Sequence, residues 1–389
     1  MKIEGNNVVV YPQGRIDSTN VAGLDEMIRE AERSQPDKAL ILDFRNVEYI
    51  SSAGLRVLQA AIKRRGKPLT VREASPEIYN ILDITGFTTM LNVERRMREI
   101  SVDGCEIIGV GAVGTVYRID ADTIVKVYNS PDALEMIRNE QHRAKQAFLK
   151  GVTTAISYDA VRVGDRYGSM FEMVDAKTYN DLLVGHPEDA EGILRDYAGM
   201  IRQIHAIEAG PGELPDCRDI YLQYIDAIGE YLPRALSERL SALFRAMPED
   251  RHLIHGDLHM KNVMLSGGEP LLIDMDTLSV GNPVFDFAGI YVAYRAFSVH
   301  EPNNSAVFLG IPDEMAERIW RTILELCVEA PDAQTFEEKV KRILTVGHLR
   351  FLYLIAVENL GGEALRDARI RDTVDTLSAL CEEVQALAV

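Results

Sequence analysis

The sequence has few cysteines and no long apolar run. Its 389 residues include four cysteines, scattered without C-x-x-C or metal-ligand spacing, so we expect reduced thiols and no zinc site. No window approaches the ~18 consecutive apolar residues of a membrane-spanning helix. Residues 1–5 do not have the composition of a signal peptide. We therefore predict a cytoplasmic protein that does not enter a membrane.

Basic residues are also scarce, and they are unevenly distributed. The chain has 42 Lys and Arg against 60 Asp and Glu, a net charge of −18. Residues 1–100 contain 15 basic and 14 acidic residues, so the acidic excess lies in the rest of the chain. Nucleic-acid binding needs clustered Lys and Arg, so the composition argues against nucleic acid as a partner. Acidity suits a cationic substrate but also serves solubility, and the composition does not choose between them.

The chain is too long for one ordinary hydrophobic core, and its first hundred residues form a distinct block. Short apolar runs in this block predict buried strands, and the segments between them have helical periodicity. A strand followed by a helix, repeated three times, is typical of a small α/β sandwich. The predicted strands cover residues 8–11, 39–44 and 68–71, and the predicted helices cover 19–33, 53–64 and 76–84.

Two segments of this block carry a family resemblance. Residues 14–17 (Gly-Arg-Ile-Asp) and 43–55 resemble the STAS domain, the fold of anti-sigma factor antagonists. The resemblance covers residues 1–100 and implies an anti-sigma factor or another protein as a binding partner. It also implies a phosphorylated serine at the strand-to-helix turn. Ser52 takes that position, and Ser51 stands where the family usually has Asp.

The sequence leaves two roles open for these serines. A phosphate of about −2 charge at a helix N-terminus meets free N–H groups and the positive end of the helix dipole, so a phosphorylation switch is physically reasonable. Serine is also a common N-cap residue, so Ser51 and Ser52 can simply begin the second helix. Both roles stand as expectations.

Glycines between two β-rich runs begin the second part of the chain. Their G-x-G-x-x-G pattern alone is a weak signal. A dinucleotide-binding fold would follow it with a helix, whereas residues 115–119 and 123–128 are β-rich. Glycines between two strands are typical of the hairpin that covers the phosphates in a kinase. The residues predicted to contact the nucleotide here are Gly109, Gly111, Gly114 and Val116.

The second strand contains a lysine that needs a counter-charge. Lys126 is flanked by two valines and stands where a kinase lysine grips the α- and β-phosphates. A half-buried lysine requires a carboxylate nearby. The helical segment 131–149 offers Glu135 and Glu140, and we predict Glu140 because it lies midway along the helix. The alternative is a surface pair between Glu140 and Arg143.

Residues 167–174 predict a strand that ends in a polar crossover. In a kinase this crossover binds the edge of adenine through main-chain groups, which would lie here near Glu172 and Val174. Met170 would border the adenine pocket. Main-chain recognition leaves little sequence signature, so this prediction rests on position alone.

Residues 255–262, His-Gly-Asp-Leu-His-Met-Lys-Asn, have the spacing of a phosphoryl-transfer site. Asp257 would orient and deprotonate the acceptor hydroxyl, and Asn262 follows five positions later, as in a kinase catalytic loop. Asp274 ends an apolar strand and would bind magnesium with Asn262, because Mg²⁺ prefers oxygen ligands. Asp276 is either a further ligand or the cap of the following turn. The predicted cofactors are therefore ATP and Mg²⁺.

Two other interpretations of this segment explain less of the sequence. His255, Asp257 and His259 could ligate a transition metal, but this leaves Asn262, Asp274 and the glycine loop without a role. A purely structural polar network would require all these elements to stand in kinase order by chance.

The chain from residue 104 onward resembles the aminoglycoside phosphotransferase and choline kinase branch of the protein-kinase-like fold. The resemblance rests on the catalytic-loop residues above and on residues 281–288, which depart from the family pattern at Asn282 and Phe287. It implies a bilobal α+β fold, with an N-lobe at 101–176 and a helical C-lobe at 177–389. It also implies that Asp286 braces the catalytic loop.

These observations predict an ATP- and Mg²⁺-dependent phosphotransferase joined to a STAS domain. No A-P-E motif or activation segment follows Asp274, which favours a small-molecule hydroxyl as the acceptor. Two alternatives remain. The acceptor is a serine of the protein's own STAS domain, Ser52 or Ser51, or the kinase-like part binds nucleotide without turnover and serves signalling.

Overall fold

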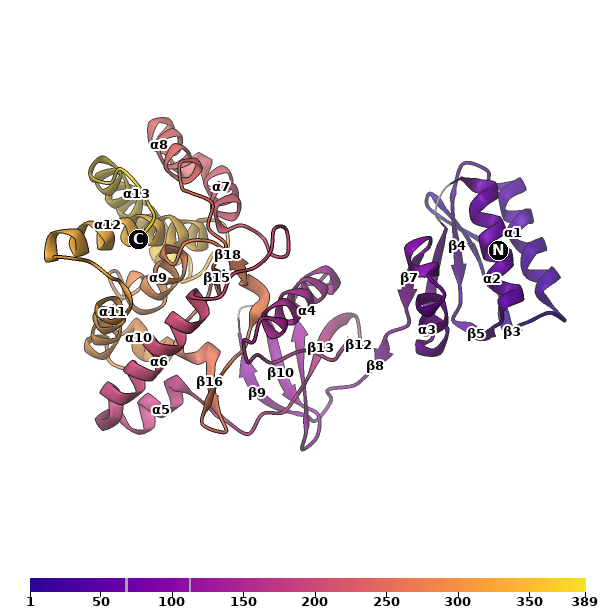
Figure 1. The fold of residues 1–389 in the computed structure, drawn as a ribbon, viewed down its shortest axis with the longest axis horizontal. Helices are drawn as coiled ribbons and strands as arrows, with labels where there is room; N and C mark the ends of the chain where they lie inside the picture. Colours follow the sequence, from indigo (N-terminus) through magenta and orange to yellow (C-terminus); the bar gives the residue numbers. More distant parts are fainter. Residues whose placement is uncertain (67–68, 112) are drawn as a thin grey trace. The chain divides into compact units, whose positions relative to one another are not determined.

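The computed structural model describes residues 1–66, 69–111 and 113–389, which form two compact units (Figure 1). The first unit consists of Met1–Ser101 with Ala160–Asp165, and the second of Val102–Asp159 with Arg166–Val389. Each unit has its own hydrophobic core. Within the described ranges, no helix combines the length and apolarity needed to cross a bilayer.

The first unit is built on a sheet with the strand order β1-β2-β4-β6-β7. β1 is antiparallel to β2, and the other neighbours in this sheet are parallel. A separate parallel pair joins β3 and β5. The strands are β1 (Lys2–Glu4), β2 (Asn7–Val10), β3 (Gln13–Ile16), β4 (Ala39–Asp43), β5 (Asn46–Ile50), β6 (Thr70–Ala74) and β7 (Asn92–Arg95).

The helices of the first unit are α1 (Val21–Ser34), α2 (Ser52–Arg65) and α3 (Pro76–Ile84). α1 and α2 lie side by side (Figure 1). Leu24 and Ile28 of α1 share one buried cluster with Leu58 of α2 and with Val8 and Leu40 of the sheet. Burial of these apolar faces is the main stabilisation of the unit.

The three predicted strands correspond to β2, β4 and β6, and the three predicted helices to α1, α2 and α3. The predicted strand 68–71 begins outside the described residues. Four strands, β1, β3, β5 and β7, were not predicted. β1 and β7 contain no buried residue, so they lack the apolar signal by which a strand is recognised.

Gly54, in the first turn of α2, is closely packed and provides a stability test. A Cβ added there would lie 2.7 Å from Cγ1 of Ile50 and 2.8 Å from Cγ2 of Ile16. We expect Gly54→Ala to destabilise the first unit by about 1–3 kcal/mol through overpacking. Gly23→Ala in α1 is the matched control, because nothing lies within 4 Å of its added Cβ, and it should stabilise the helix by about 0.5–1 kcal/mol. Amide hydrogen exchange of the full chain measures both effects, and equal protection in the two variants would contradict the expectation.

The first unit also contains β8 (Arg98–Glu99) and most of β12 (Asp159–Val163), which pair in parallel. The second unit begins with an antiparallel sheet in the order β13-β11-β10-β9. Its strands are β9 (Glu106–Val110), β10 (Gly114–Arg118), β11 (Thr123–Tyr128) and β13 (Arg166–Glu172). The helix α4 (Leu134–Leu149) contacts β13 and carries Glu140 on a buried face.

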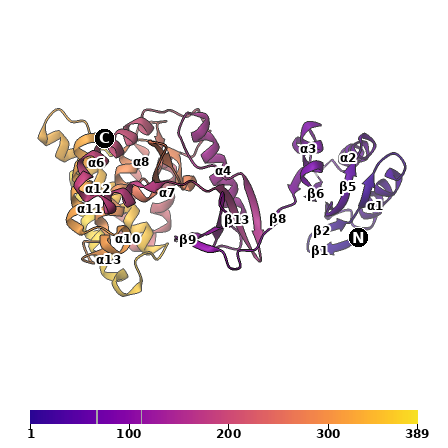
Figure 2. The ribbon, with the colours of Figure 1, turned by 90° about the horizontal axis from the view of Figure 1, so that it is seen from below.

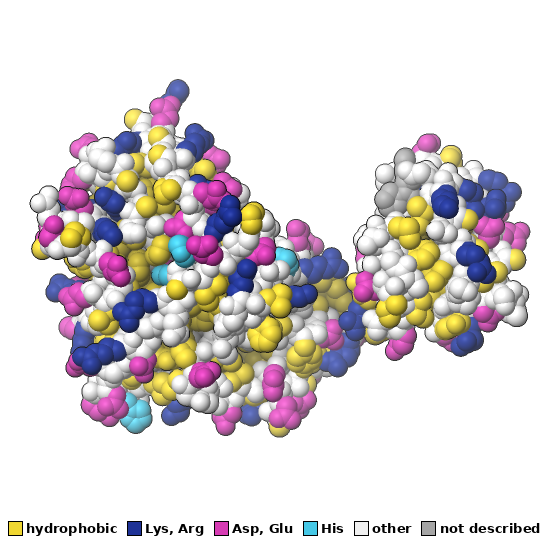
Figure 3. All heavy atoms as spheres, viewed as in Figure 1, with side chains coloured by type: hydrophobic (Ala, Val, Ile, Leu, Met, Phe, Trp, Pro, Cys, Tyr) yellow, Lys and Arg dark blue, Asp and Glu magenta, His cyan; other side chains and the backbone are white. Residues whose placement is uncertain are grey.

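The remainder of the second unit is mainly helical, and its helices gather together in both views (Figures 1 and 2). Short antiparallel strand pairs flank residues 255–262. Acidic and basic side chains are interspersed over the face of this unit seen in Figure 3. The strands are β14 (Lys177–Thr178), β15 (Leu253–Ile254), β16 (Val263–Ser266), β17 (Glu269–Leu272) and β18 (Ser279–Val280). The helices are α5 (Tyr179–Gly185), α6 (Ala190–His205), α7 (Cys217–Ala227), α8 (Arg234–Arg245), α9 (Val284–Tyr291), α10 (Asn304–Leu309), α11 (Asp313–Cys327), α12 (Ala333–Ala356) and α13 (Arg366–Glu383).

Two of these helices position the site. Every residue of α9 is buried, which fixes its polar member Asp286 inside the core. The long helix α12 packs against α9 and α13, and its residue Arg350 donates to the carbonyl of Gly256. Residues that stand far apart in the sequence therefore meet at residues 255–257.

Candidate active site

Lys126 lies between two carboxylates in the second unit. Its Nζ is 2.7 Å from Oδ1 of Asp274 and 3.5 Å from Oε2 of Glu140. The side chains of Lys126 and Glu140 are 13% and 6% exposed, so this is a largely buried ion pair. Burial alone would lower the pKa of Lys126, but Glu140 and Asp274 outweigh it and raise that pKa, which keeps the ammonium charged.

Tyr128 also binds Glu140, and it was not predicted. Its hydroxyl donates to Oε2 of Glu140 at 2.5 Å and lies 3.2 Å from Oγ of Ser169 on β13. Burial, followed by the nearby Glu140 charge, raises the pKa of Tyr128. Tyr128 stands two residues after Lys126, on the same face of β11, and this spacing was the available sequence signal.

Asp286 holds the backbone of the catalytic loop. It is completely buried and accepts hydrogen bonds from the N–H groups of His255 at 3.1 Å and Gly256 at 2.7 Å. His205 of α6 approaches the same carboxylate at 2.8 Å. Burial opposes ionisation, but His205 and the backbone donors outweigh it and lower the pKa of Asp286. These contacts agree with the brace that the family resemblance implies, and His205 was not predicted.

The rest of the catalytic loop is also held by hydrogen bonds. Tyr197 donates to the carbonyl of Leu258 at 2.6 Å, and Met260 donates its N–H to Tyr294 at 3.0 Å. Thr277 donates to the carbonyl of His255 at 2.7 Å. Donors and acceptors paired in this way fix the path of the loop.

Asp257 has a half-exposed side chain, and each of its carboxylate oxygens has polar neighbours. Oδ2 accepts from Nδ2 of Asn262 at 3.2 Å and lies 3.5 Å from Nε2 of His259, and Oδ1 lies 3.6 Å from Nη2 of Arg350. Burial acts to raise the pKa of Asp257, but His259 and Arg350 outweigh it and lower that pKa. The carboxylate is therefore ionised.

Asn262, Asp274 and Asp276 surround the other end of the loop. Nδ2 of Asn262 donates to the carbonyl of Asp257 at 2.9 Å as well as to its carboxylate, so the amide oxygen is the atom left for a ligand. Asp274 has φ of 61°, a left-handed conformation that is unusual for a residue other than glycine. Burial, followed by the charge of Asp274, raises the pKa of Asp276. A cation bound between Asp274 and Asp276 would reduce the repulsion between their negative charges.

The glycine loop forms a β-hairpin and not the strand–helix turn of a dinucleotide fold. Gly109 pairs with Val116 across β9 and β10, and Gly111 donates its N–H to the carbonyl of Gly114 at 2.9 Å. A Cβ on Gly114 would lie 2.4 Å from the carbonyl oxygen of Val127, so no larger residue fits there. Ala112, within the predicted motif, lies outside the described residues.

The predicted adenine-binding segment lies at the end of β13. Glu172 is exposed and pairs with Thr123, and the carbonyl of Val174 accepts the N–H of Ala176 at 3.0 Å. Met170 is buried within the strand. Nothing in these contacts distinguishes an adenine site from an ordinary strand end, so this role stays a prediction.

The two serines of the first unit differ in their contacts. Ser51 is the N-cap of α2, and its Oγ accepts the N–H of Ala53 at 3.2 Å. Ser52 is the first residue of α2 and is exposed, and no described residue hydrogen-bonds its hydroxyl. The capping role therefore belongs to Ser51.

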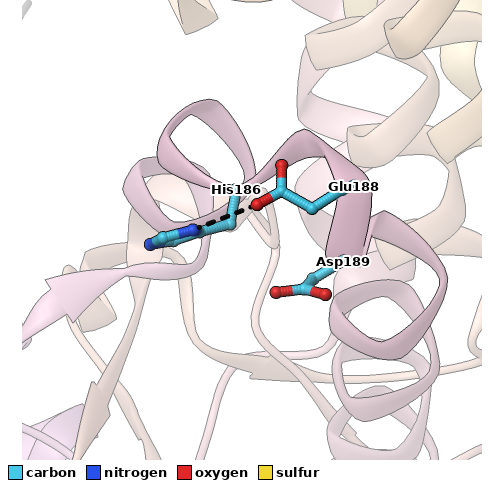
Figure 4. Close-up of side chains that lie close together, drawn as sticks. All are labelled: His186, Glu188 and Asp189. Carbon is cyan, nitrogen blue, oxygen red and sulfur yellow. Dashed lines mark hydrogen bonds and ion pairs between the residues drawn. The ribbon is translucent and has the colours of Figure 1, made fainter.

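A group of possible metal ligands lies elsewhere in the second unit, before α6. His186, Glu188 and Asp189 offer ligand atoms within 4.8 Å of one another, and His186 points toward Glu188 at 3.4 Å (Figure 4). All three are exposed, and exposed acidic groups are common without an ion. Within the described ranges, the alternative set of His255, Asp257 and His259 does not form such a group.

The model of the phosphotransferase enzyme family matches residues 104–318, which is more than half of the chain. The chain belongs to this family. A model of the STAS domain matches residues 1–100. The predicted fold class, an α/β STAS domain followed by a bilobal kinase-like fold, is thereby confirmed, as is the prediction of a phosphotransferase.

Individual relatives match each part of this phosphotransferase. BtrV of Bordetella bronchiseptica, named provisionally as an anti-sigma factor antagonist, is 30% identical over 95 residues, which is 24% of this chain and 80% of BtrV. The ADP-bound crystal structure of aminoglycoside phosphotransferase APH(2'')-Ib is 14% identical, with a TM-score of 0.49, over 79% of this chain and 99% of that chain. A thermostable mutant of APH(4)-Ia is 14% identical, with a TM-score of 0.49, over 72% and 94%.

Proposed function

We propose that the second unit transfers the γ-phosphoryl group of ATP, bound with Mg²⁺, to a hydroxyl of a small molecule. The observation that carries this proposal is the position of Lys126 Nζ, 2.7 Å from Asp274 and 3.5 Å from Glu140. This contact joins the strand after the glycine loop to α4 and to the segment after the catalytic loop. Membership of the phosphotransferase enzyme family supports the reaction class.

In this proposal the nucleotide lies along the glycine hairpin. Gly109, Gly111, Gly114 and Val116 border it, since glycines let backbone N–H groups approach phosphate closely. Lys126 binds the α- and β-phosphates, and Glu140 holds Lys126 in place. Main-chain groups near Glu172 and Val174 bind the adenine edge.

The residues at the end of the catalytic loop suit magnesium. Mg²⁺ prefers oxygen ligands and retains several waters, so an amide oxygen and one or two carboxylates are a sufficient protein contribution. Asn262 and Asp274 would hold the ion, with Asp276 as a further carboxylate. When bound, the metal neutralises charge on the β- and γ-phosphates.

Asp257 performs the proton chemistry. The acceptor hydroxyl gives its proton to the ionised Asp257 carboxylate as its oxygen bonds to the γ-phosphorus. The bond from that phosphorus to the bridging β–γ oxygen breaks, and ADP leaves. Asn262 and the backbone contacts of Asp286 orient Asp257 toward the acceptor, which is the main contribution that a protein makes to this reaction.

Two measurements test the proposed function. Isothermal titration with Mg·ADP should show one binding site that Lys126→Met weakens, because the phosphates lose their cation. ADP release from Mg·ATP should then be stimulated by one member of a panel of aminoglycosides, amino alcohols, sugars and nucleosides. A protein that does not bind Mg·ADP, or one that consumes no ATP with any acceptor or with itself, would contradict the proposal.

A second acceptor is favoured by the exposure of Ser52. Its hydroxyl stands at a helix N-terminus with no partner among the described residues, whereas Ser51 is engaged as a cap. Incubation with Mg·ATP followed by mass spectrometry of tryptic peptides tests this alternative. Phosphate on Ser52 that is lost in Asp257→Asn would make the protein its own substrate, and an unmodified peptide in a protein that turns over a small molecule would reject the alternative.

The STAS domain supplies a proposed protein partner. The named role of BtrV, together with the STAS match over residues 1–100, supports an anti-sigma factor as the partner of the first unit. Co-purification of the full chain with anti-sigma factors from the same genome tests this. Ser52→Asp is expected to weaken the complex by adding negative charge at the start of α2.

A further inference from the structure

Two side chains of opposite charge bind the backbone N–H and the backbone carbonyl of Gly256. Its N–H donates to Oδ1 of Asp286 at 2.7 Å, and its carbonyl accepts a hydrogen bond from Nη1 of Arg350. Asp286 comes from α9 and Arg350 from α12, and these two helices pack against each other. The residue before Asp257 is therefore fixed from both sides by the C-terminal helices.

Two glycines lie at this contact. Gly256 has φ of 85°, and a Cβ on it would lie 2.8 Å from the carbonyl oxygen of Thr277, so no other side chain fits. A Cβ on Gly289 of α9 would lie 3.3 Å from the Gly256 carbonyl oxygen and 3.7 Å from Nη1 of Arg350. Gly289 therefore packs closely against the Gly256 carbonyl and lies beside Arg350.

Arg350 also faces the carboxylate of Asp257. Its side chain is 13% exposed, and a cation this buried requires a counter-charge. Among the described residues, the one carboxylate within 4.0 Å of its nitrogens is Asp257, at 3.6 Å from Oδ1. Asn262 and His259 approach the other oxygen of that carboxylate, so Arg350 contacts the oxygen that these two residues do not.

We propose that Arg350 is a positioning residue for phosphoryl transfer, which holds the Gly256 carbonyl and the Asp257 carboxylate so that Asp257 meets the acceptor hydroxyl. This inference rests on the proposed function. Lys126, Glu140 and Asp274 hold the nucleotide from other elements, so Arg350 acts on turnover and not on nucleotide binding. It also joins α12 to the loop that carries Asp257.

Arg350→Met, Arg350→Lys and a matched control test the inference by kinetics. Arg350→Met should lower kcat about 10²-fold, because misplacing a catalytic group by ~1 Å has this effect, while Mg·ADP affinity and the KM for ATP stay at their wild-type values. Arg350→Lys should recover part of kcat, since it keeps the charge without the two-nitrogen fork. Arg342→Met is the control, because Arg342 lies on the same helix and donates to the carbonyl of Ala388 at 2.7 Å. Its kcat should be unchanged.

A double-mutant cycle gives a measurement that needs no acceptor. The losses in melting temperature caused by Arg350→Met and Asp257→Asn should be non-additive, because the two groups are in contact, whereas those of Arg342→Met and Asp257→Asn should add. The cycle tests the contact between Arg350 and Asp257 independently of the kinetic experiment. Additive losses in melting temperature for Arg350→Met and Asp257→Asn, or a wild-type kcat in Arg350→Met, would overturn the inference. Neither result would contradict the proposed function if the wild-type protein binds Mg·ADP. Failure of the wild-type protein to bind Mg·ADP would instead reject the proposed function.

Discussion

Replacing Asp257 by asparagine should reduce turnover by roughly 10²–10⁴-fold, the range that general-base catalysis contributes. The side chain keeps its shape and one acceptor oxygen, but it can no longer take up a proton. Asp257 has a half-exposed, ionised carboxylate at the point where the loop meets solvent, and the other carboxylate of the loop region, Asp286, is buried beneath it.

The measurement is steady-state kinetics with the acceptor that the panel identifies, together with Mg·ADP titration. Mg·ADP affinity should not change, because Lys126, Glu140 and Asp274 are untouched. Asp226→Asn is a suitable control, since Asp226 lies exposed near the end of α7. Full activity in Asp257→Asn would show that Asp257 is not the general base of the reaction.

Local patterns in the sequence predict much of this fold, because the spacing of apolar residues reflects which face of each strand or helix is buried. The strands β2, β4 and β6 are apolar runs, and α1 to α3 have helical periodicity, so both kinds of element can be recognised without tertiary information. Lys126 in a valine-rich strand and Glu140 midway along a helix stand out for the same reason. The pairing of these two residues could be expected from the cost of burying a lone ammonium.

Residues that act through long-range packing carry no such signal. Arg350 lies 94 positions after Gly256, and one arginine in a periodic helix looks like a surface residue. His205 likewise reaches Asp286 from the end of α6, 81 positions earlier. Both contacts depend on how α6, α9 and α12 pack, which periodicity does not determine. Edge strands such as β1 and β7 escape prediction for a different reason, since they are stabilised by hydrogen bonding to a neighbour and not by burial of their own side chains.

Removing the carboxylate of Asp286 should cause the largest loss of stability in the second unit. Asp286 is completely buried, and Asp286→Ala would leave the N–H groups of His255 and Gly256 and the ring of His205 without their acceptor. Breaking a buried charged pair on one side costs roughly 3–5 kcal/mol, since the remaining polar groups stay away from water. We expect a loss of this size in the free energy of unfolding, measured by urea denaturation of the full chain.

Asp332→Ala separates this effect from the ordinary loss of an aspartate. Asp332 caps α12 by accepting the N–H of Thr335 at 2.7 Å, and it is exposed. Its removal should cost about 1 kcal/mol, the usual contribution of an N-cap. The loss in the free energy of unfolding for Asp286→Asn should lie between those of the two alanine variants. An amide offers one acceptor oxygen, but it turns its NH₂ group toward a donor. If Asp286→Ala lost no more stability than Asp332→Ala, the catalytic loop would be held by its other contacts, chiefly those of Arg350, Thr277 and Tyr197, and Asp286 would not be its brace.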